Sequence, residues 1–273
     1  MSKIEKALRK AYDKKKKDSK NNDDSDGTHQ QEIEEGFPSI DTNDDLYLSG
    51  SSDENKFIAS DLDERKVIFS GLESRKITNA FRDLRTQLLQ KSNNKNFTVL
   101  VSSANEGMDS SFVAINLAAA FSLDETKTSL VVDCELDNPK VHDVLGLDAE
   151  LGVLDYLTDD SIDVSNVIYQ VGIDRLRIIP SGKQKRQRSE YFNTVKMKLL
   201  LKSLTERYEN RYIFVSGPPV TQSADTKILA EMCDYIIIVI PYGEVVNSDL
   251  QLIHDDLPKN KIVGVVFNNI PSA

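Results

Sequence analysis

The feature that most limits how this chain can fold is the alternation of apolar, β-branched runs with helical patterns after residue 96. Near-continuous apolar strands separated by helices are typical of a parallel sheet that is covered on both faces. We therefore expect an α/β domain with a mostly parallel central sheet and helices on both faces. The expected strands are residues 97–103, 129–133, 176–180, 212–216, 235–240 and 261–268, and the expected helices are residues 73–90, 110–122, 190–208, 224–233 and 247–256.

Charge is distributed unevenly along the 273 residues, whose formal net charge is −10. Residues 1–17 carry a net charge of +6, residues 18–64 carry −13, and the remainder carries −3. The first stretch places apolar side chains at helical spacing among lysines, which predicts a basic amphipathic helix that either docks on a membrane surface or partner or stays solvated. Residues 18–64 have too few clustered apolar side chains to fold, so we expect an acidic disordered linker. The folded domain is then residues 65–273.

The cysteines and histidines give no sign of a metal centre. Cys134 and Cys233 lie within apolar runs, so we expect buried, reduced thiols. His29, His142 and His254 share no spacing that is typical of metal ligands. No run approaches the roughly 20 apolar residues of a membrane span, and the first residues lack the apolar region of a secretory signal. The sequence therefore predicts a cytoplasmic protein.

A short basic loop, Lys183-Gln-Lys-Arg-Gln-Arg188, follows the expected strand at residues 176–180. Ligands of an open parallel sheet bind beyond the carboxyl ends of the strands, so these charges could hold an anionic polymer, a lipid headgroup or a phosphate. A solvated loop is the alternative interpretation. No aromatic residues alternate with the charges, so we expect no nucleic-acid partner.

The segment Val101-Ser-Ser-Ala-Asn-Glu-Gly-Met-Asp-Ser-Ser-Phe-Val-Ala-Ile-Asn-Leu-Ala joins an expected strand to an expected helix. It fails the P-loop pattern G-x-x-x-x-G-K-[ST]. Nevertheless it resembles the nucleotide-binding loop of the bacterial tyrosine kinases and of their ParA/MinD-type ATPase relatives. The resemblance places Gly107 on the first loop glycine, Asp109 on the second, Ser110 on the lysine and Ser111 on the magnesium-binding hydroxyl.

Further segments resemble the same family in the same order. The stretch that begins at Leu130 is similar to the second acidic motif, with Asp133 kept and Glu135 in place of the second aspartate. In Tyr212-Ile-Phe-Val-Ser-Gly-Pro-Pro, Ser216 stands where the family has the Walker B aspartate. Asn268, at the end of the last expected strand, often lies near the adenine in relatives. The resemblance covers residues 73–270 and implies a P-loop NTPase fold of the ParA/MinD type. Two other matching blocks are Gly152-Val-Leu-Asp-Tyr-Leu and Leu176-Arg-Ile-Ile-Pro-Ser-Gly.

Departures from the family pattern concern phosphate and metal binding. Ser110 has no ammonium group to place on the β- and γ-phosphates, and Asp109 adds a negative charge beside a polyanion. With Ser216 in place of an acid, Asp133 and Ser111 are the only metal ligands that remain. Asp133 has an alternative interpretation as a strand-end carboxylate that caps a turn.

We therefore expect a degenerate site that binds neither ATP nor Mg²⁺, although both would be needed if activity were retained. No residue is assigned a catalytic role, and Asp133 and Glu135 are interpreted as vestiges of the family's acidic motif. We also expect the tyrosine-rich tail that the kinases phosphorylate to be missing, because residues 269–273 after the last expected strand contain no tyrosine.

One helical segment bears on self-association. Asn79-Ala-Phe-Arg-Asp-Leu-Arg85 resembles the Glu-x-x-Arg-x-x-Arg motif through which these kinases form rings. Arg82 and Arg85 are kept, but Asn79 replaces the acid, so one half of the implied salt bridge is missing. A homo-oligomer formed by this route and a simple exposed helix are both consistent with the segment.

The resemblance implies a cytoplasmic regulator of exopolysaccharide or capsular polysaccharide synthesis or export, with a degenerate ATP site. Its implied partner is the cytoplasmic end of a membrane polysaccharide co-polymerase that regulates chain length. Two alternatives are open: an active protein-tyrosine autokinase or ATPase of the same pathway, and a ParA/MinD-like module that positions itself on the membrane. The location is cytoplasmic, or peripheral at the inner membrane face through residues 1–17.

Overall fold

The structure is a computed structural model that describes residues 59–69, 75–106, 110–182, 191–206, 210–241 and 247–268. The predicted basic helix at residues 1–17 and the predicted basic loop at residues 183–188 lie outside this part of the chain. Most of the predicted acidic linker lies outside it as well.

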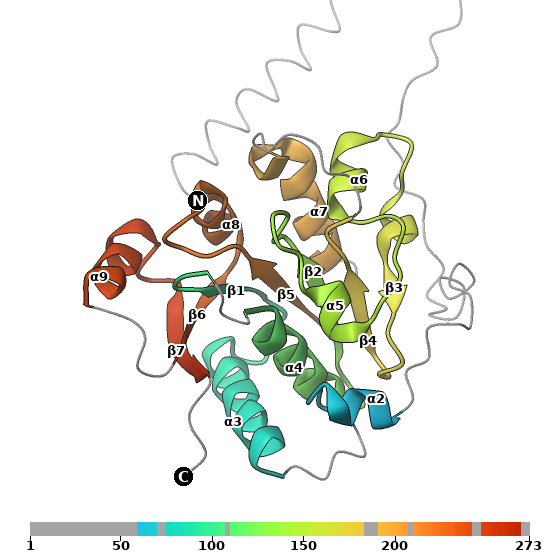
Figure 1. The fold of residues 1–273 in the computed structure, drawn as a ribbon, viewed down its shortest axis with the longest axis horizontal. Coiled ribbons are helices and arrows are strands. Elements are labelled where there is room, and N and C mark those ends of the chain that lie inside the picture. The colour runs from blue at the N-terminus through green and yellow to red at the C-terminus, as the bar shows by residue number, and fades with distance from the viewer. Residues whose placement is uncertain are drawn as a thin grey trace, which may run out of the picture. The chain divides into compact units, whose positions relative to one another are not determined.

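A seven-stranded sheet is the centre of the fold, in the order β3-β4-β2-β5-β1-β6-β7. Every neighbouring pair is parallel except β3 and β4, which are antiparallel. The mostly parallel sheet predicted from the apolar runs is therefore confirmed (Figure 1). The strands are β1 Thr98–Ser103, β2 Thr128–Asp133, β3 Tyr169–Gln170, β4 Leu176–Ile179, β5 Arg211–Gly217, β6 Tyr235–Pro241 and β7 Ile262–Asn268.

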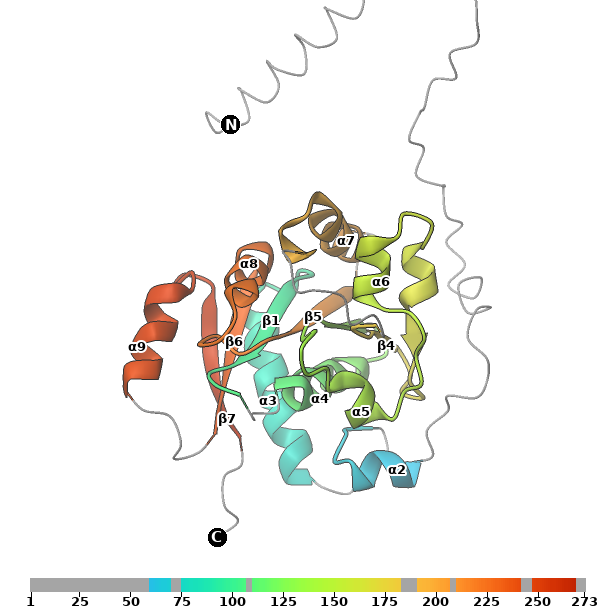
Figure 2. The ribbon, with the colours of Figure 1, turned by 45° about the horizontal axis from the view of Figure 1, so that its top comes forward.

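Helices cover both faces of this sheet, as Figure 2 shows from a second direction. Helices α3, α4 and α5 pack on the face that carries Val99 and Val131, whereas α6, α7, α8 and α9 pack on the face that carries Leu100 and Leu130. The two layers follow from the alternation of side chains along each strand. The helices are α2 Ala59–Glu64, α3 Arg75–Lys91, α4 Ser110–Ser122, α5 Val141–Leu145, α6 Val153–Thr158, α7 Val195–Glu206, α8 Ala224–Met232 and α9 Asn247–Asp256, with short 3₁₀ turns η3 Val164–Val167 and η4 Tyr191–Asn193.

The start of the folded domain differs from the sequence prediction. Residues 59–64 were expected to belong to the disordered linker, but they form α2, whose Leu62 is buried. Val67 and Ile68 follow it at 0% exposure, and the Ile68 N–H donates to Oδ1 of Asn116 at 2.9 Å. The segment folds because a buried amide in α4 satisfies its backbone, and a charge count along the sequence does not reveal that contact.

Smaller elements also differ from the prediction. Strand β3 and helices α5 and α6 had not been expected, and the single helix expected at residues 190–208 is divided into η4 and α7. These elements are two to six residues long, apart from α7, and such lengths are too short for hydrophobic periodicity to reveal. Within the part of the chain that the structure describes, no helix has both the length and the apolarity to cross a bilayer.

Candidate functional site

The carboxyl ends of β1, β2 and β5 lie together at one end of the sheet, next to the amino end of α4. We call this end the carboxyl edge of the sheet; it is distinct from the edge strands β3 and β7. The sequence argument placed its candidate site at this edge, where open α/β sheets bind ligands. Ser110, Ser111, Asp133 and Ser216 all lie here and are all buried. Gly107 and Asp109, which the resemblance assigned to the same loop, lie outside the described residues.

The central contact of this edge is a hydrogen bond between two serine hydroxyls. Ser111 in the first turn of α4 and Ser216 near the end of β5 place their Oγ atoms 3.0 Å apart. The exposed fractions of the two residues are 1% and 0%. The structure therefore joins the residue assigned as the magnesium-binding hydroxyl directly to the residue at the Walker B position.

Asp133 lies at the end of β2 and is fully buried. Its Cα is in register with that of Ser216, which places Asp133 beside the serine pair. Its Oδ1 accepts the backbone N–H of Glu135 at 3.1 Å, which closes an Asx-type turn. Glu135 is itself 7% exposed. This geometry agrees with the interpretation of Asp133 as a carboxylate that caps a turn.

A magnesium site at this end of the sheet would depend on Asp133, Glu135 and the Ser111 hydroxyl. Mg²⁺ takes six oxygen ligands in near-octahedral geometry and is held in proteins by one or two carboxylates with water or phosphate. Within the described residues, no group of three His, Cys, Asp or Glu side chains could hold a metal ion. The Ser111 hydroxyl is hydrogen-bonded to that of Ser216.

A second acidic feature of the edge is Asp225, in the first turn of α8. Burial raises the pKa of its carboxyl above the usual value, and the nearby charge of Asp137 raises it further. Adding a polyphosphate would place more negative charge beside these carboxylates. Two carboxylates, one from the segment after β2 and one from the start of α8, therefore lie close enough to influence each other at this end of the sheet.

The Pro218 carbonyl organises the loop after β5, and sequence reasoning missed it. It accepts the Ser102 hydroxyl at 2.5 Å and the Thr226 hydroxyl at 2.8 Å, and both residues are 0% exposed. Thr221 in the same loop donates to the Ala104 carbonyl and contacts Oδ1 of Asn105 at 2.7 Å. The only sequence signal was the clustering of small hydroxyl residues at strand ends. The loops after β1 and β5 are thereby fixed to each other.

The chain that follows β4 is fixed to the start of α6. The Pro180 carbonyl accepts the Val153 N–H at 2.8 Å, and the Ser181 carbonyl accepts the Leu154 N–H at 3.0 Å. Gly152 caps the same helix and donates its own N–H to Oδ2 of Asp155 at 2.9 Å. The two sequence blocks that resemble the kinase family, at residues 152–157 and 176–182, therefore pack on each other.

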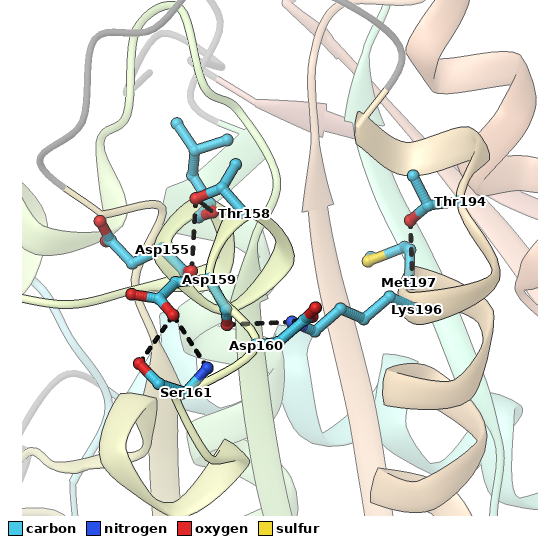
Figure 3. Close-up of polar contacts among 9 residues, drawn as sticks. Asp155, Thr158, Asp159, Asp160, Ser161, Thr194, Lys196 and Met197 are labelled. Atoms are coloured by element: carbon cyan, nitrogen blue, oxygen red, sulfur yellow. Dashed lines mark hydrogen bonds and ion pairs between the residues drawn. The ribbon is translucent and has the colours of Figure 1, made fainter.

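Lys196 ties the start of α7 to the turn after α6 (Figure 3). Its ammonium lies 2.7 Å from Oδ1 of Asp160, donates to the Asp159 carbonyl at 3.0 Å, and sits 4.8 Å from the ring centroid of Tyr156. The Asp159 carboxylate accepts the backbone N–H and hydroxyl of Ser161, and these hydrogen bonds lower its pKa. These contacts hold the end of α6 against the start of α7.

Both cysteines are free and buried on the α7–α8 side of the sheet, as the sequence predicted. Burial raises the pKa of the Cys233 thiol to about 12 and that of the Cys134 thiol well above its usual value. Both side chains are therefore neutral core residues without the thiolate that cysteine chemistry requires.

Comparison with known proteins identifies homologues of this chain. No protein-family model matches the chain. Tyrosine-protein kinase CpsD of Streptococcus agalactiae serotype Ia is 22% identical over 196 residues, which are 71% of this chain and 82% of CpsD. EpsB of Ralstonia solanacearum, by name a tyrosine-protein kinase, is 29% identical over 197 residues, which are 69% of this chain. The homologues of this chain are bacterial tyrosine-protein kinases. The chain matches only 25% of the length of EpsB.

Solved structures of the same group share the fold. The kinase domain of the Escherichia coli tyrosine kinase ETK superposes with a TM-score of 0.63 at 21% identity, covering 72% of this chain and 78% of the domain. A MinD protein also matches, as expected for a ParA/MinD-like P-loop NTPase fold. At this level of identity the superposition shows the fold of this chain and nothing about its chemistry.

Arg82 and Arg85, in the segment that resembles the ring-forming motif of the kinases, have different environments. Arg85 lies on the inner side of α3 and donates to the Ala120 carbonyl at 2.7 Å, near the carboxyl end of α4. Arg82 is exposed on the same helix. A cation at this end of a helix stabilises its unpaired carbonyls and dipole. The Arg85 side chain therefore stabilises the folded domain. This role does not depend on self-association.

We expect Arg85→Ala to lower the free energy of unfolding by about 1–2 kcal/mol, because it removes a charge-assisted bond to a helix end. Arg82→Ala is the matched control on the same helix and should change the free energy of unfolding by less than about 0.5 kcal/mol. Urea unfolding followed by circular dichroism measures both. Equal effects of the two substitutions would contradict the assignment of Arg85.

Asn268 ends β7, where its Cα is in register with that of Pro241, and its side chain is partly buried. It therefore lies three strands away from Ser216, with β1 and β6 between them. The structure places it at the predicted edge but does not bring it into contact with the serine pair.

Proposed function

We propose that this chain is a non-catalytic, kinase-like subunit that regulates exopolysaccharide or capsular polysaccharide assembly. The observation that carries this proposal is the buried hydrogen bond between Ser111 and Ser216. In a working site of this fold, the corresponding positions carry a hydroxyl and an acid that together hold a metal ion. Here two neutral hydroxyls satisfy each other.

The chemistry of phosphoryl transfer supports a loss of activity. Such enzymes act mainly by positioning the nucleotide and neutralising its charge, through a lysine and a bound metal ion. The resemblance places Ser110 at the position of the lysine, and Ser110 is buried at the start of α4. At these positions Ser110 supplies no ammonium group, and Ser216 supplies no carboxylate to a metal ion.

The pathway assignment rests on the kinase homologues and on the resemblance of the whole domain to polysaccharide-associated autokinases. We propose that the folded domain binds the cytoplasmic end of a membrane protein that controls polymer chain length. Its location is then cytoplasmic and peripheral to the inner membrane face. In this role the kinase fold acts as a binding scaffold.

The test is a phosphoryl-transfer assay on the purified full chain, mixed with the chain-length regulator that a neighbouring gene encodes. With radiolabelled Mg-ATP, the proposal predicts no autophosphorylation, no phosphorylation of the partner, and co-purification of the two proteins without nucleotide. Phosphate incorporation that depends on this chain would favour an active kinase instead. Failure to bind the partner, combined with lipid-dependent ATP hydrolysis, would favour a membrane-positioning ATPase.

A further inference from the structure

Strand β7 forms one edge of the sheet, and within the part of the chain that the structure describes β6 is its only paired neighbour. Its sequence, Ile-Val-Gly-Val-Val-Phe-Asn, contains no charged residue and no proline. Proteins usually protect exposed edges with charges, prolines or very short strands, because an open edge can pair with another chain. The opposite edge follows this rule, since β3 has only two residues.

Two exposed apolar side chains mark the same strand. Val265 is 45% exposed and Phe267 is 58% exposed. They lie two residues apart and so point to one face of the sheet. Their register partners on β6, Ile238 and Ile240, are buried at 1% and 4% exposure. The apolar layer of the sheet therefore continues to its edge without a polar boundary.

We propose that the β7 edge binds the β7 edge of a second copy of this chain, in antiparallel register about a two-fold axis through Val266. This register places Val265 opposite Phe267 of the second copy, and Phe267 opposite its Val265. Pairs of an aromatic and a β-branched residue are among the favourable cross-strand pairs. The register of β7 against β6 is regular from Gly264 to Asn268, which gives a straight edge for the pairing.

A second copy fits this edge because the strand complements itself. Antiparallel pairing about Val266 brings no like charges together, and it covers both exposed side chains in a single contact. Gly264 faces Asn268 of the second copy in this register, and there is open space around the Cβ position of Gly264. A contact of five residue pairs is smaller than a standard interface of about 1,600 Å², so the dimer should be weak.

Sedimentation velocity on the full chain tests this contact. We expect reversible dimerisation with a dissociation constant of about 10–100 µM. Association should strengthen with added salt, because each copy carries a net charge of −10. Val265→Lys should weaken the dimer at least about tenfold, since an edge lysine blocks strand pairing. The matched control is Leu199→Lys on α7, where the native residue is similarly exposed at 54%, and it should leave association unchanged.

Cross-linking tests the register independently of those variants. Mixing Val265→Cys protein with Phe267→Cys protein should give a disulfide-linked heterodimer faster than either protein alone gives a homodimer. The native cysteines are buried and do not interfere. A wild-type chain that stays monomeric throughout this concentration range would overturn the proposal. Equal weakening by Leu199→Lys, no preference for the mixed disulfide, or β7 pairing only with added peptides or other proteins would overturn it as well.

Discussion

Replacing Ser216 by aspartate should destabilise the protein by about 3 kcal/mol at neutral pH, because it buries a second carboxylate beside Asp133. The Cα atoms of residues 133 and 216 are register partners on adjacent strands, and both residues are 0% exposed. The same substitution would restore an acid at the Walker B position. The stability of this variant therefore distinguishes a site that can still accommodate an acid and a metal ion from a site that is packed around two hydroxyls.

The control for this experiment is Ser216→Asn, which has the same shape without the charge and should cost clearly less. The deficit of the aspartate variant should also depend on pH. Burial beside an acid raises the folded-state pKa of the new carboxyl, so the deficit is complete above that pKa and disappears as pH falls to about 4, the unfolded value. Thermal unfolding of both variants across this pH range measures it. An aspartate variant as stable as the asparagine variant at neutral pH would show that the pocket tolerates a second charge.

Gly152→Ala should cost about 3 kcal/mol or more in unfolding free energy, or prevent folding. A Cβ at this position would lie 2.3 Å from the Gly182 nitrogen and 2.3 Å from the Pro180 oxygen. Both are backbone atoms, so neither can move aside as a flexible side chain would. Relieving the clash separates the chain after β4 from the start of α6 and breaks the hydrogen bonds between them.

The matched control is Gly264→Ala, because no atom lies within 4 Å of a Cβ built at that position. Its effect on unfolding free energy should be within about 1 kcal/mol, and it should be stabilising if alanine suits the strand better than glycine. Urea unfolding curves compare the two variants directly. Similar midpoints for both would mean that the contact between residues 152 and 182 is not tightly packed in solution.

The centre of the sheet could be predicted because its inner strands are buried on both faces and so appear in the sequence as continuous apolar runs. Residues 98–103 and 211–217 are buried throughout, and both were expected as strands almost to their observed ends. Helix α4 is buried on nearly every side, so it has little amphipathic pattern, and its expected position gained support from the resemblance to the kinase loop.

Elements that depend on distant backbone contacts could not be predicted from local pattern. Helix α6 begins where Val153 and Leu154 bond to carbonyls about 27 residues later in the chain, a contact that no periodicity encodes. The fold of α2 and the chain after it similarly depends on Asn116, 48 residues beyond Ile68. Asn116 lies within the helix expected at residues 110–122, but only the structure shows what its side chain contacts.

The candidate site was predicted in place but not in detail. Ser111 and Ser216 were assigned to one edge of the sheet from resemblance, and the structure brings their hydroxyls together across 105 residues of sequence. Their direct bond could not be foreseen, because the family pattern has a metal ion and an acid at this point. Arg85 is a second example, since its bond to Ala120 depends on how α3 packs on α4.

Calorimetric titration of the full chain with Mg-ATP tests the central claim most directly, with Asp109→Gly/Ser110→Lys as the variant that restores a glycine and a lysine to the loop. For the wild type we expect no saturable heat of nucleotide binding at tens of micromolar Mg-ATP. For the double variant we expect measurable binding. Micromolar binding of Mg-ATP by the wild type would contradict the claim that the serine pair has replaced a working nucleotide site.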